Sequence, residues 1–383
     1  MNPGVLLISP DFPPARGGVA DHTLRLAHEL AARGPVAVLT STANQSAQPF
    51  PVYAAISDWT DAESLARAIA TRAADKTLLW QYVPHMYGRG GVNAAIGNVL
   101  HRLRHHAPGQ LVIAHEIAAP FSPLPHRFWY ALNHRRQWRQ ILATAGAVGI
   151  SSEAWLEEWT RREPQHAAKL FLLPSPATIP VVPVPTTHAC DWRAAQQLPT
   201  DCRVLAYFGT LSANKQFDWV LAAWERAQNS GQPVALALAG GDAAITVPAA
   251  LRPLFRPLGY LPADEVSRLL QAADVLALPF IDGVSERRTS FMAGLSHGCA
   301  VATTLGHNTG STLRHADCFA ATEATDEAAF VATVHSLLTD DARRARLAAA
   351  GRAAFHARYD WPCVIERLET ARLNLASAPG AGR

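Results

Sequence analysis

The sequence has no paired cysteines and no long apolar runs. Its five cysteines are scattered and none forms a Cys-x-x-Cys pair, so neither a disulfide framework nor a zinc site is indicated. No stretch reaches the roughly 18 apolar residues of a spanning helix, and residues 1–4 lack the cationic start of a signal peptide. We therefore expect a cytoplasmic protein in which any membrane contact is peripheral, on the inner membrane face.

An excess of charge of one sign is also missing. The formal net charge is +3, with 16 His not counted. This charge is too small to require nucleic acid as a partner but suits an anionic substrate. Of the 383 residues, 49% are apolar and 17% are charged, which excludes a disordered chain and provides cores for two domains of ordinary size.

Several nucleotide-binding and catalytic motifs are absent as well. The sequence contains no Asp-x-Asp pair to hold a divalent ion under a diphosphate, no Walker loop, no Gly-x-Ser-x-Gly elbow and no G-x-G-x-x-G spacing. A diphosphate bound by this chain would have to be neutralised by Lys, Arg and helix ends. We therefore expect no metal site and no cofactor.

Short apolar runs alternate with longer helical stretches. This pattern is typical of parallel strands covered on both faces by helices. In the first half it predicts a helix at 19–32 and strands at 5–9, 36–40, 77–82, 111–115 and 147–151. In the second half it predicts strands at 203–208, 234–239, 275–279 and 300–304, and helices at 217–228, 263–272, 290–297, 325–338, 341–357 and 362–376.

A Pro-rich stretch separates the two halves. Residues 173–185 read LPSPATIPVVPVP, and proline stiffens the backbone and removes hydrogen-bond donors, so this stretch is predicted to be a linker. The predicted domains are 1–180 and 181–361, with the helix at 362–376 packing back on the first domain. Two α/β halves imply a cleft between them, where ligands usually bind.

Two loops that join a strand to a helix are candidate anion sites. Residues 13–20 include the pair Gly17 and Gly18, which lets backbone approach a ligand at a helix start. Residues 208–215 include Gly209, Thr210 and Lys215, and a lysine near a helix start is unfavourable unless an anion lies there too. The alternatives are an ordinary turn and a solvated surface lysine.

Two further groups of polar residues follow predicted strands. Residues 282–290 read DGVSERRTS, and the adjacent Arg287 and Arg288 at a helix start form a candidate clamp for phosphate. His115 and Glu116 lie where a strand ends, at the edge of an open sheet that faces ligands. An ordinary N-capped helix and a structural histidine are the alternatives.

These residues and their order resemble the retaining GT-B glycosyltransferases of glycosyltransferase family four. The first half carries PDFPPARGGVADHT, LLWQYVPHMYG, AHE and GISSEAW. The second half carries FGTLSANKQFDWVLAAW, LAGGD, LGYLPADEVSRLLQAADVLALPF and GCAVATT. The resemblance spans nearly the whole chain and implies the GT-B fold: two Rossmann-like, doubly wound α/β domains that face each other across a cleft.

The resemblance also implies roles for individual residues. Gly17 and Gly18 match the loop that approaches the donor diphosphate, and Lys215 matches the lysine that binds phosphate. His115 matches the histidine at the reacting face. The remaining donor contacts match Gly259 and Tyr260 at the nucleotide base, Gly209 and Thr210 in the loop before Lys215, and Ser285, Glu286, Arg288, Thr289 and Ser290 in the segment whose amides cradle sugar and diphosphate.

The donor loop departs from the family pattern of Glu, seven residues, then Glu. Ser285 and Ala293 occupy those two positions, and Glu286 is one residue away from the first. Glu286 could serve as that Glu if the loop is rearranged. Arg287 and Arg288 could replace the arginine that family members carry near the lysine. The pattern is similar to that of a bacterial subgroup with a Ser-x-Arg-Arg signature.

We expect a metal-independent, retaining hexosyltransferase that uses a UDP- or GDP-linked sugar. The expected acceptor is a glycan, a glycolipid or a small molecule, as in polysaccharide biosynthesis. A sugar-nucleotide epimerase and a non-catalytic partner subunit with the same fold are the alternatives. Residues 126–139 mix aromatic and cationic side chains, which suits contact with anionic lipid, although a solvated basic helix that packs its aromatics inward is the favoured interpretation.

Overall fold

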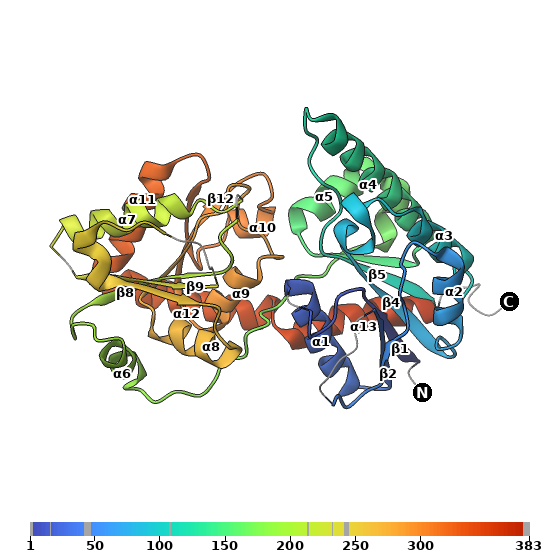
Figure 1. Ribbon diagram of the computed structural model, residues 1–383, viewed down its shortest axis with the longest axis horizontal. Coiled ribbons are helices and arrows are strands. Elements are labelled where there is room, and N and C mark those ends of the chain that lie inside the picture. Colours follow the sequence, from blue (N-terminus) through green and yellow to red (C-terminus); the bar gives the residue numbers. More distant parts are fainter. Residues whose placement is uncertain are drawn as a thin grey trace. The chain divides into compact units, whose positions relative to one another are not determined.

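The computed structural model describes residues 3–15, 17–41, 47–106, 109–212, 214–231, 233–240 and 245–377. The chain divides into two compact units (Figure 1). The first comprises Met1–Ser151, Trp155–Ser175 and Trp361–Arg383, and the second comprises Ser152–Ala154 and Pro176–Asp360. The passage from Ser175 to Pro176 falls inside the Pro-rich stretch.

The first domain is built on a seven-stranded parallel sheet of order β3-β2-β1-β4-β5-β6-β7. Its strands are β1 (Gly4–Ile8), β2 (Val36–Thr40), β3 (Val52–Ala54), β4 (Lys76–Tyr82), β5 (Gln110–Ala114), β6 (Ala147–Ile150) and β7 (Leu170–Leu172). The helices around it are α1 (Gly18–Ala31), α2 (Ala62–Ala70), α3 (Ala94–Arg102), α4 (Pro125–Thr144), α5 (Glu153–Arg162) and α13 (Trp361–Ser377), with short 3-10 turns η1 (Pro84–Tyr87), η2 (Arg89–Gly91) and η3 (Pro164–Lys169).

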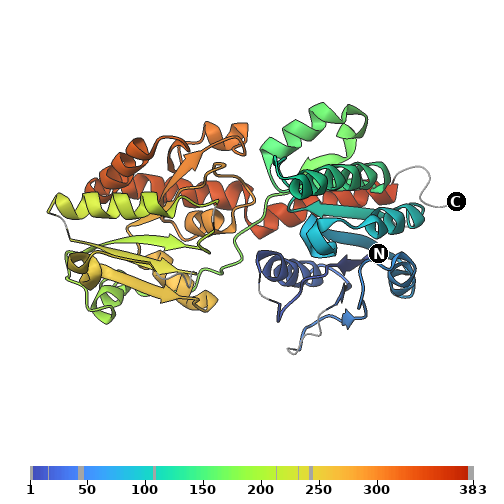
Figure 2. The same ribbon diagram turned by 45° about the horizontal axis from the view of Figure 1, so that its top comes forward.

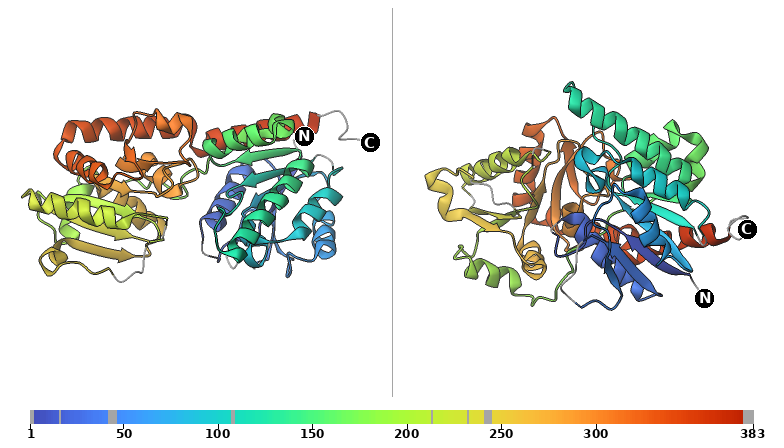
Figure 3. Two further views of the ribbon diagram at one scale, coloured as in Figure 1. Left: turned by 90° about the horizontal axis from the view of Figure 1, so that it is seen from above. Right: turned by 45° about the vertical axis from the view of Figure 1, so that its right-hand side comes forward.

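Alternating side chains of these strands enter two separate cores. Val5 and Leu7 of β1 pack with α1 and α13 on one face, and Leu6 and Ile8 pack with α2, α3 and α4 on the other (Figure 3). Because successive strand residues point to opposite faces, a strand covered on both sides must be apolar throughout. This explains why β1 reads as a continuous apolar run with no polar alternation.

The second domain is built on a six-stranded parallel sheet of order β10-β9-β8-β11-β12-β13. Its strands are β8 (Arg203–Phe208), β9 (Val234–Ala239), β10 (Phe255–Gly259), β11 (Val275–Leu278), β12 (Ala300–Leu305) and β13 (Ala320–Glu323). Its helices are α6 (His188–Ala195), α7 (Phe217–Asn229), α8 (Ala263–Ala272), α9 (Thr289–Ser296), α10 (Ser311–Arg314), α11 (Glu327–Thr339) and α12 (Asp341–Arg358), with η4 (Ala249–Leu254). α7 packs with α11, α9 with α12, and α6 with α8 (Figure 2).

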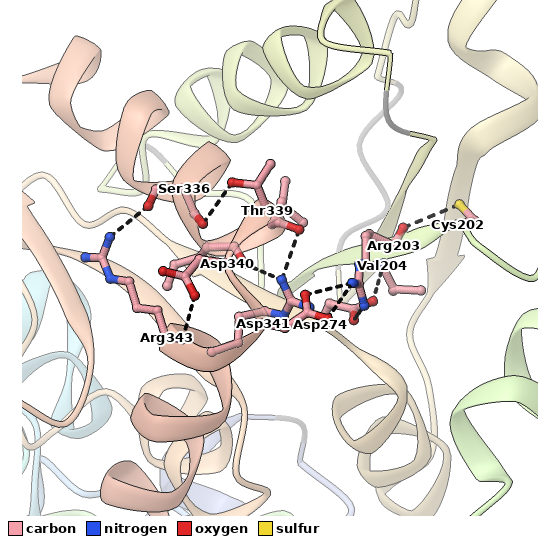
Figure 4. A network of polar contacts seen from close by, with 12 residues as sticks. Cys202, Arg203, Val204, Asp274, Ser336, Thr339, Asp340, Asp341 and Arg343 are labelled. Carbon is pink, nitrogen blue, oxygen red and sulfur yellow. Dashed lines mark hydrogen bonds and ion pairs between the residues drawn. The ribbon is translucent and has the colours of Figure 1, made fainter.

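A polar network fixes the amino ends of strands in the second domain (Figure 4). Arg203, at the start of β8, bridges Asp274 at 3.1 Å and Asp341 at 2.8 Å. The same Asp274 carboxylate accepts from the Val204 amide at 2.8 Å and pairs with Arg193 at 2.7 Å. The network therefore links β8, the residue before β11 and the start of α12 at the edge opposite to the carboxyl ends of the strands.

The predicted fold class of two Rossmann-like, doubly wound α/β domains is confirmed. Every strand and helix predicted from the apolar pattern is present, with bounds that differ by at most a few residues. The strands that were not predicted are β3, β7, β10 and β13. These strands lie at or next to the sheet edges and are short or less buried, so they lack the continuous apolar run that identifies a central strand.

Candidate functional site

Three glycines line the carboxyl edge of the sheet in the second domain. Gly209, Gly240 and Gly259 follow or end the adjacent strands β8, β9 and β10, with φ of 134°, 95° and 63°. The Gly240 amide donates to the Gly259 carbonyl at 2.7 Å. A Cβ at Gly240 would lie only 3.1 Å from the Gly209 backbone. Side chains are thus excluded here and backbone is presented, at the edge where open α/β sheets bind ligands.

The Lys215 side chain folds back over Gly209. A Cβ at position 209 would lie 2.5 Å from the Lys215 Nζ, and that Nζ is 5.7 Å from the centroid of the Tyr207 ring. Burial, and then the nearby Arg288 charge, lower the pKa of Lys215 to about 8. Within the described residues no carboxylate pairs with this ammonium. It is a partly dehydrated cation, which favours an anionic ligand.

Arg288 is held beside this lysine by an aromatic ring and a carboxylate. Its guanidinium lies 4.5 Å from the centroid of the Phe280 ring and is ion-paired with Asp282. Asp282 also accepts from Arg287 at 3.2 Å and from the Asn308 side chain at 2.8 Å. The structure therefore brings Lys215 and Arg288 together, and it shows that one carboxylate orients both arginines. The pairing of Asp282 with the arginines was not predicted.

The loop that carries Asp282 packs tightly against the loop after β12. Gly283 has φ of 87°, and a Cβ there would lie 2.2 Å from the Gly306 amide nitrogen. The Val284 amide donates to the Thr304 carbonyl at 2.8 Å. Ser285 is fully buried and its hydroxyl has no partner in the described part of the chain. The tight packing fixes the backbone that leads into α9.

Helix α9 begins at Thr289 and has no side-chain cap. The first amides of a helix have no partner within it and carry partial positive charge. Ser290 is buried and Thr289 half-buried. The helix start adds donor groups to the same region as the two arginines, because Arg288 is its N-cap residue.

Glu286, the residue that could serve as the first Glu of a rearranged donor loop, is buried in this structure. It is only 1% exposed, and its Oε2 accepts from the Glu153 amide at 3.1 Å. Burial, followed by the nearby Glu286 charge, raises the pKa of Tyr359 to about 12. The carboxylate of Glu286 is therefore turned into the protein in this structure, because an internal amide binds it.

The other predicted donor contacts are exposed. Tyr260 follows Gly259 and is 67% exposed. Thr210 follows Gly209, is also exposed, and its carbonyl accepts from the Tyr207 hydroxyl at 3.2 Å. Both lie next to glycines at the carboxyl edge of the sheet. Asp242 and the rest of the LAGGD string after Gly240 lie outside the described residues.

His115 of the first domain follows β5 and is buried among aromatic and polar groups. Its Nε2 is hydrogen-bonded to Gln81 Oε1, and its ring meets the His22 ring edge-on at 4.7 Å between centroids. Trp361, at the start of α13, packs on His22 at 5.3 Å. Burial lowers the pKa of His115 to about 4. His115 is thus a neutral imidazole at pH 7, and its contact with His22 was not predicted.

Gly17 and Gly18 are exposed at the start of α1, the helix that carries His22. A Cβ at either glycine would meet no atom of the described residues within 4 Å. The loop has the open backbone expected of a ligand contact, whereas neighbouring Arg16 lies outside the described residues.

The first turns of α4 carry an exposed apolar surface. Phe128 and Trp129 are 50% and 58% exposed, while Trp138 is fully buried. The prediction that the aromatic residues of this helix pack inward is therefore right for Trp138 and wrong for Phe128 and Trp129. We refer to the exposed apolar residues Phe121, Leu124, Phe128, Trp129 and Leu132 as the α4 surface.

No helix in the described ranges is long and apolar enough to cross a membrane. The same residues contain no group of three or more His, Cys, Asp or Glu side chains that could hold a metal ion.

The architecture is the GT-B fold, and comparisons with known proteins agree with it. Residues 202–340 match the family model described as glycosyl transferases group 1. Sucrose-phosphate synthase from Thermosynechococcus elongatus is similar, with a TM-score of 0.71 and 19% identity over 98% of this chain and 100% of that chain. No curated protein sequence matches the chain.

Two other solved structures are similar over comparable lengths. Anabaena HepE in complex with UDP and glucose has a TM-score of 0.70 and 13% identity, over 96% of this chain and 98% of that chain. WaaG, a glycosyltransferase involved in lipopolysaccharide biosynthesis, has a TM-score of 0.67 and 15% identity, over 96% of this chain and 99% of that chain.

Proposed function

We propose that the protein is a glycosyltransferase that takes a hexose from a nucleoside diphosphate sugar, with retention and without a metal ion. The observation that carries this proposal is the Lys215 ammonium, which lies over Gly209 and next to Arg288 at the carboxyl edge of a parallel sheet. The match of this domain to group 1 glycosyl transferases supports it. So does the structural similarity to HepE, whose complexes contain UDP and UDP-glucose.

The charges of the site suit a diphosphate. Lys215, Arg287 and Arg288 are cationic, and the carboxylate of Asp282 pairs with both arginines. The Lys215 ammonium, the two guanidinium groups and the amides that begin α9 are the kinds of group that bind phosphate oxygens. These groups supply what a divalent ion supplies in other enzymes, so the leaving group is neutralised by the protein itself.

The proposed reaction breaks the bond between the sugar C1 and the diphosphate oxygen. Negative charge grows on that oxygen as the bond lengthens, and Lys215 and Arg288 stabilise it most strongly in the transition state. The acceptor hydroxyl forms the new C1–O bond on the face that the diphosphate leaves. Its proton passes to the departing diphosphate oxygen, so that the charges balance without another base.

The base of the donor is assigned to the region of Gly259 and Tyr260, beside the three glycines. The donor would be UDP- or GDP-linked, and the UDP complexes of HepE make uridine donors the first to test. The acceptor, a glycan, a glycolipid or a small molecule, would be bound by the first domain, which carries His115 and the α4 surface.

A peripheral membrane contact through the α4 surface is part of the proposal. The exposed Phe128 and Trp129 follow the exposed Arg127, and the exposed Arg136 lies further along the same helix. This combination favours the interface of anionic lipid. Vesicles with and without anionic lipid would be compared for wild type, Phe128→Ser with Trp129→Ser, and a control Val181→Ser that removes an equally exposed apolar side chain. Equal sedimentation of all three would refute the contact.

Charge reversal at Arg135 is unsuitable for that experiment. Its guanidinium donates to the carbonyls of Ala119 and Ala131 at 2.9 and 3.0 Å and stacks 3.9 Å from the Phe121 ring centroid. Reversal would therefore break the contacts that hold the segment before α4 against the helix. Arg136 is exposed and is the suitable position for a test of charge.

The function is tested with a panel of nucleotide sugars. Thermal shift identifies the donor that binds, since a ligand at 100 times its Kd stabilises by about 2.7 kcal/mol. Lys215→Met is then compared with Arg226→Met, which removes an exposed charge from α7. Loss of less than about tenfold in kcat/KM for Lys215→Met, relative to the control, would remove Lys215 from the site.

The same assays separate the two alternatives. Release of nucleotide that depends on an acceptor indicates transfer, whereas isomerised donor without acceptor indicates an epimerase. Calorimetric binding of a nucleotide sugar, with no turnover across acceptors, indicates a non-catalytic partner subunit.

A further inference from the structure

Three buried side chains meet at the carboxyl edge of the sheet in the first domain. Gln81 is fully buried on β4, His115 follows β5 with 9% exposure, and His22 lies one turn into α1 with 4% exposure. Their order follows from the sheet, because β1, β4 and β5 are neighbours and α1 follows β1. Buried polar groups cost free energy unless they form hydrogen bonds within the protein or with a ligand.

The hydrogen bond between Gln81 and His115 determines which ring nitrogen of His115 carries the proton. Gln81 presents Oε1 to Nε2 of His115. Because an amide oxygen only accepts, Nε2 is the donor in this orientation of the Gln81 amide. A neutral imidazole has one N–H, which leaves Nδ1 with a lone pair. Nδ1 has no hydrogen-bond partner within the described residues, and the residual exposure of the ring leaves room for a substrate group to reach it.

Packing maintains this arrangement. The His22 ring meets the His115 ring edge-on, and Trp361 closes the other side of His22. The His115 amide also donates to the Tyr82 carbonyl at 2.9 Å, which fixes the backbone. Burial lowers the pKa of both His22 and His115, which keeps the pair uncharged at neutral pH. The His115 ring therefore cannot turn over without displacing His22.

We propose that Gln81 is a positioning residue, which accepts the Nε2 proton of His115 and thereby presents Nδ1 as the acceptor for a sugar hydroxyl. This inference rests on the proposed function, because the sugar of that reaction supplies the hydroxyl group that Nδ1 would bind. No new bond is formed in this step. His115 orients the sugar, and Gln81 acts only through the tautomer of His115.

Two substitutions at the buried Gln81 distinguish an effect of the His115 tautomer from an effect of side-chain shape. Gln81→Met keeps an unbranched side chain of similar length but has no strong acceptor, whereas Gln81→Glu keeps an acceptor at the same place. Proton–nitrogen correlation spectra of protein labelled at histidine report which nitrogen of His115 carries the proton. We expect the Nε2–H form in wild type and Gln81→Glu, and a mixture or the Nδ1–H form in Gln81→Met.

Kinetics test the consequence for the reaction. We expect kcat/KM to fall roughly tenfold or more in Gln81→Met and to recover in part in Gln81→Glu. A second pair uses His115 itself, because Asn places its polar atom near the position of Nδ1 and Gln places it near Nε2. His115→Asn should retain more activity than His115→Gln.

The outcomes are distinct from those of the donor experiments. An Nδ1–H tautomer in the wild-type protein would overturn the proposal, whatever reaction the protein catalyses. Equal kcat/KM of Gln81→Met and Gln81→Glu would also overturn it, provided that both variants unfold at the same denaturant concentration. If wild type turns over no nucleotide sugar, the proposed function fails while the spectra still decide the tautomer.

Discussion

The contact between Lys215 and Gly209 allows a substitution that moves one ammonium and leaves the core in place. In Gly209→Ala the new methyl group would lie 2.5 Å from the Lys215 Nζ. The ammonium is the far end of a flexible side chain, so it moves and the sheet does not. The φ of 134° at position 209 is also unfavourable for alanine, at a cost of about 1–2 kcal/mol.

We expect Gly209→Ala to lower kcat/KM by more than its loss of folding stability would explain. A hydrogen bond to a charged group is worth about 1.5–3 kcal/mol. Its loss in the transition state would lower kcat/KM roughly tenfold to hundredfold. The assay is nucleotide release from the donor identified by thermal shift, combined with urea unfolding of the same preparation.

Gly231→Ala is the matched control. Gly231 has φ of 84° and follows α7 on the opposite edge of the sheet, and a Cβ there would meet no described atom within 4 Å. It therefore has a backbone strain similar to that of Gly209→Ala without displacing a cation. If the two variants bind and turn over the donor equally well, the role assigned to the ammonium above Gly209 is refuted.

The two lowered pKa values and the tight turn at Gly283 can each be tested separately. The pKa of Lys215 is lowered to about 8, so nucleotide affinity should fall as pH rises from 7 to 9, and calorimetry of Lys215→Met should show no such fall. The pKa of His115 is lowered from 6.5 to about 4, so between these pH values only the unfolded chain binds the proton. The free energy of unfolding should therefore drop by about 3 kcal/mol as pH falls from 6.5 to 4. In urea unfolding, His115→Asn should remove this part of the pH dependence, and an unchanged pH dependence would contradict the prediction. In Gly283→Ala the methyl group would lie 2.2 Å from the Gly306 backbone nitrogen, so unfolding should become easier by roughly 3 kcal/mol, and a change below about 1 kcal/mol in chemical denaturation would show that the two loops are not locked together.

Much of the fold could be predicted because its signals are local. A strand such as β2 is apolar from Val36 to Leu39, and α8 shows helical spacing, so both were predicted with the observed bounds. β10 contains Pro257 and is only partly buried, so its sequence resembles a loop. Pairing with β9 makes it a strand, and pairing between distant segments is not encoded in a short window of sequence.

The candidate site likewise combines features that the sequence predicted with features that only the structure showed. The glycine after β8 and the adjacent arginines before α9 were identified from residue type and from their position between a strand and a helix. The structure alone pairs Arg287 and Arg288 with Asp282, and it alone turns Glu286 toward an internal amide. Which carboxylate meets which cation depends on side-chain rotamers and on the packing of the loop, and residue type does not specify either.

The sequence by itself determined where the central strands end, which of the loops after them are rich in glycine and which cations could meet an anion. These features follow from the periodicity and chemistry of neighbouring residues. The tertiary structure decided that His22 and Trp361 enclose His115 and that Gln81 sets its tautomer. These residues come from different strands and from the two ends of the chain. Only the parallel sheet, which places the carboxyl ends of β1, β4 and β5 side by side, brings them into contact.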